Sequence, residues 1–278
     1  MSLAGKTLIM SGGSRGIGEA IAVRAAADGA NVALLAKTDQ PHPSLPGTIH
    51  TAAEAIEAAG GRALPLVGDI RDDAFVADAV ARTVERFGGI DVVVNNASAI
   101  DLSRTADITM KKYDLMNDIN ARGSFLLSKA CLEHLARADN PHVLTLSPPI
   151  SLDPKWFATT GTAYTMAKFA MSLVTLGLSA ELRDQGIAAN SLWPRTAIDT
   201  AAVRNVLGGD MVTNSRTPQI MADAAHEILV QPSTTYTGQF LIDDEVLAAA
   251  GVTDFSIYLN GGREEDLAPD FWVEAAPQ

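Results

Sequence analysis

Residues 7–18 read TLIMSGGSRGIG, and an amphipathic stretch up to Asp28 follows them. The first five residues are apolar or small, as in a buried strand, and the glycines permit a tight turn in which the backbone approaches a ligand closely. The helix that follows would point free amides and the positive end of its dipole at an anion. This order of strand, glycine loop and helix predicts a pyrophosphate site. The residues expected to contact a nucleotide are Gly12, Ser14, Arg15, Gly16, Ile17 and Gly18.

The same alternation continues along the chain. Short aliphatic runs alternate with longer helical patterns, which predicts one doubly wound α/β sheet of about seven parallel strands with helices on both faces. We expect a single domain over residues 1–278, with an irregular C-terminal extension from about Val246. The predicted strands are Thr7–Ser11, Asn31–Ala36, Leu64–Gly68, Val92–Asn95, Val143–Ser147, Ala188–Leu192 and Gln239–Ile242. The predicted helices are Gly16–Asp28, Thr48–Ala59, Asp72–Phe87, Lys111–Ala136, Gly161–Asp184 and Pro218–Val230.

Composition limits the partners that the chain can have. Its formal net charge is −12, which argues against nucleic acid and anionic membrane surfaces as partners. No run approaches the length of a membrane span, and the start of the chain lacks a signal-peptide pattern. Cys131 is the only cysteine, and the five histidines are scattered without metal-ligand spacing. We therefore expect no metal site and a cytoplasmic protein.

The end of the second strand indicates which nicotinamide cofactor is used. An acidic residue at this position would hold the ribose 2′-hydroxyl of NAD. Here Ala36 and Lys37 stand at the tip, and Arg15 of the glycine loop lies at the same corner. Two cations favour a 2′-phosphate, so we predict NADP(H). Asp39 is close enough in sequence to keep NAD as an alternative.

Tyr164 and Lys168 form the clearest catalytic pair. They are four residues apart on a predicted helix, so both side chains lie on one face. An ammonium beside a phenol favours the phenolate and would lower the pKa of the tyrosine. A tyrosine of that kind can donate or accept a proton near neutral pH.

Together these motifs resemble the short-chain dehydrogenase/reductase family, over nearly the whole chain to about Asp244. The resemblance implies a Rossmann-type fold and a catalytic tetrad that includes Tyr164, Lys168 and Asn120, the asparagine of the proton relay. Two departures stand out: Ser98 replaces a glycine in the Asn-Asn-Ala-Gly motif, and Arg195 replaces a glycine in the nicotinamide loop. The further cofactor contacts that it implies are Asp69, Ile70, Asn96, Ala97, Ser98, Pro194, Thr196 and Ile198, besides Tyr164 and Lys168.

Within the family, the chain is similar to one subgroup, the hydroxysteroid dehydrogenase-like protein 2 group. The shared traits are Ala36-Lys37-Thr38, Asn95-Asn96-Ala97-Ser98-Ala99-Ile100, Ser147-Pro148-Pro149 and Leu192-Trp193-Pro194. Eukaryotic members carry a C-terminal sterol-carrier domain. This sequence ends at Gln278, so we expect lipid transfer and peroxisomal residence not to carry over.

The catalytic serine has two candidates. Counting back thirteen residues from Tyr164, as is usual in the family, gives Ser151. Counting forward from the fifth strand gives Ser147, which we favour because the sheet fixes strand ends whereas loops vary in length.

The resemblance implies hydride transfer between NADP(H) and a carbonyl or alcohol. Tyr164 would exchange the proton, and the serine would stabilise the oxyanion. We expect Pro194–Met211 and Ser151–Thr160 to cover an apolar pocket for a lipid, acyl or steroid-like substrate, and we expect a homo-oligomer (dimer or tetramer). A nucleotide-binding sensor or scaffold with little turnover, and a reductase of enoyl or dienoyl thioesters, remain alternatives.

Overall fold

A seven-stranded parallel sheet organises the computed structural model, which describes residues 2–41, 45–201, 203–204 and 212–274. The strand order is β3-β2-β1-β4-β5-β6-β7, so the predicted doubly wound sheet is confirmed. The connection from β3 to β4 reverses the direction of winding, and the carboxyl ends of β1 and β4 therefore flank the crevice where ligands bind in such sheets. The strands are β1 (Thr7–Ser11), β2 (Asn31–Ala36), β3 (Arg62–Val67), β4 (Val92–Asn95), β5 (His142–Thr145), β6 (Ala188–Trp193) and β7 (Phe240–Ile242).

Alternate residues of the central strands enter two separate cores, one on each face of the sheet. In β1, Leu8 and Met10 pack in the first core and Ile9 packs in the second. Every residue of β1, β4 and β5 is buried. This explains why the strands read as unbroken apolar runs rather than as alternating patterns.

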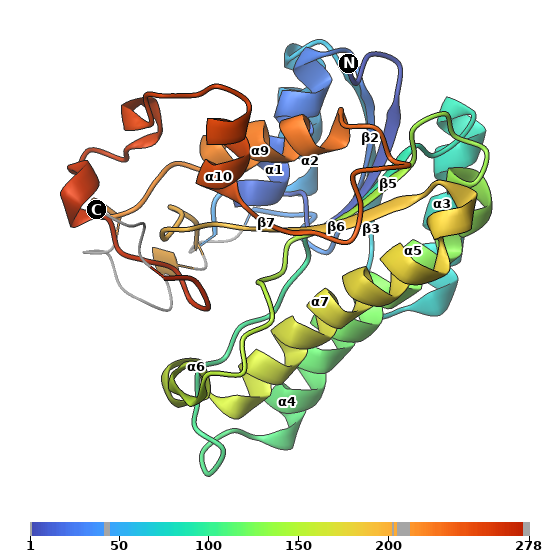
Figure 1. The fold of residues 1–278 in the computed structure, drawn as a ribbon. Coiled ribbons are helices and arrows are strands. Elements are labelled where there is room, and N and C mark those ends of the chain that lie inside the picture. The colour runs from blue at the N-terminus through green and yellow to red at the C-terminus, as the bar shows by residue number, and fades with distance from the viewer. Residues whose placement is uncertain (1, 42–44, 202, 205–211, 275–278) are drawn as a thin grey trace.

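Helices cover both faces (Figure 1). The first core holds α1 (Gly16–Ala27), α2 (Ile49–Ala58) and α9 (Gln219–Leu229), and the second holds α3 (Asp73–Phe87), α5 (Gly123–Leu135) and α7 (Thr162–Glu181). Cys131 of α5 is fully buried in the second core, where burial raises the pKa of its thiol far above the ordinary range. The shorter helices are α4 (Met110–Met116), α6 (Pro154–Thr160), α10 (Asp243–Ala249), and the 3-10 turns Arg183–Gln185, Ser256–Tyr258 and Glu264–Asp266.

The predicted helix Lys111–Ala136 is interrupted in the structure. A π-helical turn, Asn117–Arg122, lies between α4 and α5. Such turns are rare and occur most often at functional sites. Asn120, a predicted catalytic residue, lies within it.

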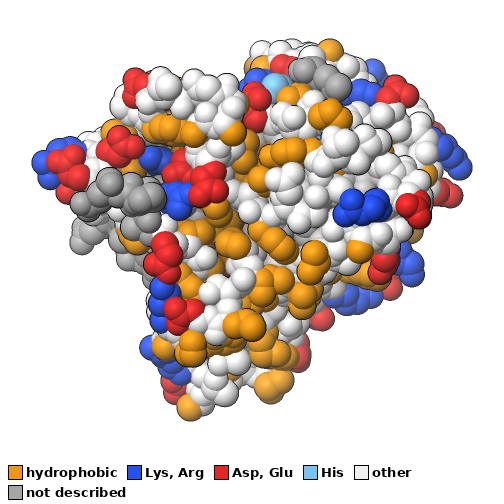
Figure 2. All heavy atoms as spheres, in the orientation of Figure 1, with side chains coloured by type: hydrophobic (Ala, Val, Ile, Leu, Met, Phe, Trp, Pro, Cys, Tyr) orange, Lys and Arg blue, Asp and Glu red, His pale blue; other side chains and the backbone are white. Residues whose placement is uncertain are grey.

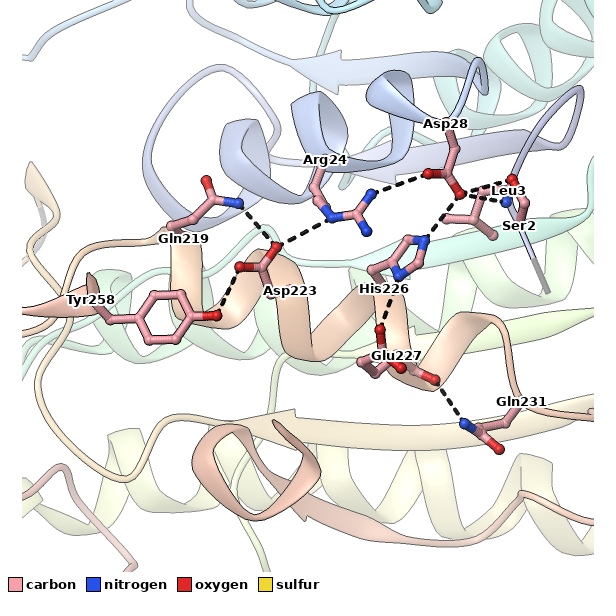
Figure 3. Close-up of polar contacts among 10 residues, drawn as sticks. All are labelled: Ser2, Leu3, Arg24, Asp28, Gln219, Asp223, His226, Glu227, Gln231 and Tyr258. Atoms are coloured by element: carbon pink, nitrogen blue, oxygen red, sulfur yellow. Dashed lines mark hydrogen bonds and ion pairs between the residues drawn. The ribbon is translucent and has the colours of Figure 1, made fainter. Parts of the chain in front are cut away.

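A polar network joins the first and last parts of the chain (Figure 3). Arg24 of α1 bridges Asp28 and Asp223, with distances of 3.2 Å to each carboxylate. His226 of α9 lies 3.0 Å from the second oxygen of Asp28, and the hydroxyl of Tyr258 donates to Asp223 at 2.9 Å. The network therefore ties α9 and the 3-10 turn Ser256–Tyr258 to the last turn of α1, the helix that follows the glycine loop.

Among the described residues, no helix is long and apolar enough to cross a membrane. In the same part of the chain, no group of three or more His, Cys, Asp or Glu side chains could hold a metal ion.

Candidate active site

One cavity of about 630 Å³ lies across the carboxyl ends of the strands. It extends from the glycine loop and the tips of β2 and β3 to the Tyr164 and Lys168 side chains of α7. Most of the predicted cofactor residues line it: Gly12, Ser14, Arg15, Gly16, Ile17, Lys37, Asp69, Ile70, Asn96, Ala97, Ser98, Tyr164, Lys168, Pro194 and Ile198. Gly18 and Thr196 are not part of the lining.

The glycine loop is locked against the end of β4. Gly12 has a φ of +76°, and a Cβ added there would lie 2.8 Å from the Cα of Ala97. The Asn96 amide donates to the Gly12 carbonyl at 2.8 Å, and a Cβ on Gly18 would lie 2.5 Å from that amide nitrogen. The hydroxyl of Ser11 accepts from the backbone N–H of Ala97 at 3.1 Å. Only glycine fits at positions 12 and 18, and the loop leaves a cradle in which a pyrophosphate fits.

Two cations stand at the nucleotide end of the cavity. Lys37 is well exposed, and its ammonium lies 3.0 Å from a carboxylate oxygen of Asp69. The guanidinium of Arg15 donates to the carbonyls of Pro46 at 2.9 Å and Gly47 at 3.1 Å. The neighbouring Arg71 and Lys37 hold the pKa of the Asp69 carboxyl well below its usual range. The sequence did not indicate the pairing of Lys37 with Asp69, because the two residues follow different strands, β2 and β3.

Asp39, the acidic residue that left NAD as the alternative cofactor, lies outside the cavity lining. One of its carboxylate oxygens is 2.7 Å from Nε2 of His50, and the other accepts from Gln40.

Tyr164 and Lys168 are both buried and line the cavity together. The Lys168 ammonium donates to the backbone carbonyl of Leu146 at 2.7 Å and lies 4.7 Å from the centre of the Trp193 ring. Burial lowers the pKa of Lys168 to about 7, although the nearby Asp270 carboxylate opposes this shift. An ammonium with so low a pKa can lose its proton near neutrality.

The predicted lowering of the Tyr164 pKa is wrong for this arrangement. Burial raises the pKa of Tyr164 well above its ordinary value, and Asp270 adds to the rise. Desolvation outweighs Lys168, whose ammonium bonds to a backbone carbonyl instead of the phenol. In this arrangement Tyr164 is therefore a neutral phenol rather than a phenolate.

Neither candidate serine lines the cavity. Ser147 is almost fully buried, and its hydroxyl lies 2.9 Å from that of Ser191 on β6. Ser151 lies in the segment before α6, where its hydroxyl is 3.4 Å from the N–H of Asp153. The structure thus brings Tyr164 and Lys168 together in the cavity lining, and neither Ser147 nor Ser151 joins them there.

Asn120 is fully buried and also lies outside the lining. Its amide exchanges two hydrogen bonds with Ala99, accepting from the N–H at 2.7 Å and donating to the carbonyl at 3.0 Å. This pair of hydrogen bonds fixes the backbone of Ala99, just after Ser98 at the cavity wall. The side chain therefore positions the loop that follows β4.

Part of the segment predicted to cover the pocket, residues 202 and 205–211, lies outside the described residues. Of the described part, Pro194, Ala197, Ile198, Thr200, Ala201 and Val203 line the cavity. No residue of Ser151–Thr160 does so; Trp156 and Phe157 pack instead at the edge of the aromatic cluster around Tyr164 and Trp272.

The C-terminal extension contributes residues that the sequence patterns did not indicate. Pro269, Asp270 and Phe271 line the cavity next to Tyr164, Lys168 and Trp193. The one available signal was Arg195, since an arginine where relatives have glycine needs acceptor partners. The structure supplies them in the carboxylates of Asp244 and Glu245 and, from the extension itself, in the carbonyl of Glu274.

Comparisons with known proteins agree with this geometry. The sequence model for short chain dehydrogenase matches residues 6–208. Hydroxysteroid dehydrogenase-like protein 2 of Danio rerio is 53% identical over 277 residues, which cover 99% of this chain and 66% of that protein. The chain thus spans less than two thirds of the length of that relative.

Two solved structures are similar over almost their whole length. A short chain dehydrogenase of Mycobacterium thermoresistibile is 56% identical with a TM-score of 0.93, covering 100% of this chain and 98% of that one. A Xanthomonas campestris protein is 57% identical with a TM-score of 0.94, covering 99% and 100%. The predicted resemblance to the family and to its hydroxysteroid dehydrogenase-like subgroup is confirmed. This chain belongs to the short-chain dehydrogenase family.

Proposed function

We propose that the protein is an NADP(H)-dependent oxidoreductase that interconverts a carbonyl and an alcohol. Membership of the family supports a nicotinamide cofactor and oxidoreductase chemistry. The observation that carries the proposal is the single cavity joining the glycine cradle to Tyr164 and Lys168. A dinucleotide that reaches from one end to the other would bring its nicotinamide beside a buried phenol.

The residues of the chain have defined parts in this reaction. The loop of Gly12 and Gly16, together with Arg15 and Lys37, would hold NADPH, which would supply a hydride to the carbonyl carbon. Tyr164, whose raised pKa keeps it protonated, donates its proton to the carbonyl oxygen. Lys168 has a pKa of about 7 and lines the same cavity, so it can take part in returning that proton. The apolar walls formed by Ile100, Trp193 and Phe271 exclude water and favour an apolar substrate.

The preference for NADP(H) rests on charge at the nucleotide end. Arg15 and Lys37 line the cavity there, whereas Asp39 is turned to His50. We expect the double variant Lys37→Ala, Arg15→Ala to weaken NADPH binding by about tenfold to a hundredfold, because charge-assisted hydrogen bonds contribute about 1.5–3 kcal/mol. NADH binding should change much less. Fluorescence titration with both cofactors measures this, and equal losses for NADPH and NADH would reject the assignment.

A matched control is Arg62→Ala, which removes a cation at the other end of β3, outside the cavity lining. It should leave both affinities unchanged.

One observation favours a second candidate, a nucleotide-binding protein with little turnover. Neither Ser147 nor Ser151, the two serines predicted to stabilise the oxyanion, lines the cavity, and the Ser147 hydroxyl bonds to Ser191. A screen of ketones, aldehydes and enoyl thioesters with NADPH separates the candidates. Binding of NADPH without oxidation of it on any substrate would favour the sensor.

We also propose that the protein is a homo-oligomer built through α5 and α7. Figure 2 shows apolar side chains gathered over the part of the surface where α7 and α4 lie. On α7, Leu173 is 57% exposed and Leu176 45%, and on the neighbouring α5, Phe125 is 51% exposed. The helices pack side by side, and an apolar surface of this kind on a monomer is typical of an interface.

The double variant Leu173→Glu, Leu176→Glu should be monomeric in sedimentation experiments, because it would bury charges in the interface. The control Leu152→Glu changes a still more exposed leucine that is on neither helix, and it should keep the wild-type assembly. An unchanged mass for the double variant would contradict this interface.

A further inference from the structure

Residues 268–273, the C-terminal segment, lie antiparallel to the loop that follows β6. The Ala197 N–H donates to the Ala268 carbonyl at 2.9 Å, and the Asp270 N–H donates to the Arg195 carbonyl at 2.9 Å. Between them Thr196 and Pro269 form an antiparallel bridge. The C-terminal segment is therefore fixed by backbone bonds along one wall of the cavity.

Aromatic packing holds the same segment from the other side. The Trp272 ring lies 5.5 Å from the Tyr164 ring and 5.6 Å from the Trp193 ring, centre to centre. The indole N–H of Trp193 donates to the Phe271 carbonyl at 2.9 Å. Trp272 has a φ of 63°, which is unfavourable for a residue with a large side chain and is kept here by the surrounding contacts. The backbone of Asp270 is thus held beside the catalytic tyrosine.

The side chain of Asp270 has capacity for another partner. One of its carboxylate oxygens accepts from the Phe271 N–H at 2.6 Å. Within the described part of the chain, no cation lies within ion-pairing distance of it. Asp270 is partly exposed, and it lines the cavity.

The charged groups around Asp270 do not neutralise it by contact. Lys168 lines the same cavity and interacts with the Asp270 carboxylate electrostatically, without an ion-pair contact, and Asp270 in turn raises the pKa of the neutral Tyr164 phenol. The guanidinium of Arg195 is engaged with Asp244 and Glu245. Burial raises the pKa of Asp270 to about 7, which reflects a carboxylate poorly solvated among apolar walls. A ligand that donates a hydrogen bond would relieve that desolvation.

We propose that Asp270 determines substrate specificity by accepting a hydrogen bond from a donor that the substrate carries close to its reacting carbonyl. The substrate class would then be an apolar carbonyl compound with a neighbouring hydroxyl or amino group. Repulsion from Asp270 would disfavour compounds that carry a carboxylate at that place. The inference rests on the proposed function and narrows its substrate.

Three aromatic ketones test the inference. Acetophenone is the reference compound, phenacyl alcohol carries a hydroxyl on the carbon next to the carbonyl, and phenylglyoxylate has a carboxylate in place of the methyl group. We expect the wild-type kcat/KM with NADPH to be about tenfold to a hundredfold higher for phenacyl alcohol than for acetophenone, as for a hydrogen bond to a charged acceptor. Phenylglyoxylate should be the poorest substrate.

Asp270→Asn keeps the acceptor for the Phe271 N–H and removes the charge. It should reduce the preference for phenacyl alcohol to about threefold or less and improve turnover of phenylglyoxylate. Asp270→Leu should abolish the preference. Glu274→Gln is the matched control, because it removes a well-exposed carboxylate from the same end of the chain, and it should keep the wild-type preference.

Two outcomes would overturn the inference: equal preference in the wild type and Asp270→Asn, or weaker NADPH binding in Asp270→Asn with unchanged preference, which would assign the carboxylate to the cofactor. If the wild type reduces none of the ketones, calorimetry with NADPH present can compare the binding of the two corresponding alcohols. These are 1-phenylethanol, from acetophenone, and styrene glycol, from phenacyl alcohol. Tighter binding of the diol that depends on Asp270 would support the inference although the proposed function had failed. Equal binding of both would refute it.

Discussion

Tyr164→Phe should reduce NADPH-linked turnover by about a hundredfold to ten-thousandfold, the usual contribution of a positioned general acid. NADPH affinity should stay close to that of the wild type. The change removes one hydroxyl and leaves the ring in contact with Trp272, so the aromatic cluster keeps its packing. Steady-state kinetics and fluorescence titration of NADPH measure the two effects separately.

Tyr113→Phe is the control for this variant. Tyr113 lies on α4 and is not part of the cavity lining, so its loss of a hydroxyl should leave turnover unchanged. If Tyr164→Phe kept wild-type turnover, Tyr164 would not be the proton donor. The cavity would then be supported only as a nucleotide site.

Arg195→Gln should lower the free energy of unfolding by about 2–3 kcal/mol. Only 11% of the Arg195 side chain is exposed, and it binds both Asp244, at 2.6 Å, and Glu245. It also donates to the Glu274 carbonyl at 3.1 Å. Removing the guanidinium leaves the Asp244 and Glu245 carboxylates without their cation, and Asp244 lies close enough to the fully buried Asp243 to raise the pKa of that carboxyl. Urea unfolding measures the loss.

The same variant should loosen the C-terminal segment. Hydrogen exchange of the backbone amides in residues 268–273 should become faster, while the central strands β1 and β4 keep their protection. Arg263→Gln, which removes an exposed arginine paired with Asp266, should change neither quantity. Unchanged exchange in Arg195→Gln would show that the backbone bonds and the aromatic cluster hold the segment without the arginine.

The sheet could be predicted from the sequence because its signals are local. Strands buried on both faces read as apolar runs, and the glycines at 12 and 18 reflect contacts that admit no side chain. The structure differs from the prediction at element boundaries. Strand β3 begins at Arg62 rather than Leu64, and a π-helical turn interrupts the predicted helix Lys111–Ala136. Hydrophobic periodicity does not distinguish a π turn from an α-helical one.

The site was harder to predict where it depends on contacts between distant residues. Tyr164 and Lys168 were found because one helix sets their spacing. The direction of the Tyr164 pKa was missed, since burial by Trp272 and the nearby carboxylate of Asp270 come from the C-terminal segment. The partner of the Ser147 hydroxyl could not be predicted, because counting from a strand end does not show which way a side chain turns. Its hydroxyl turns to Ser191 on the neighbouring strand.

A crystal structure of the protein with bound NADP⁺ tests the central claim most directly. The account predicts the pyrophosphate at the loop of Gly12 and Gly16, the 2′-phosphate within reach of Arg15 and Lys37, and the nicotinamide ring beside the hydroxyl of Tyr164. A nucleotide bound with its nicotinamide away from Tyr164, or bound outside this cavity altogether, would contradict it.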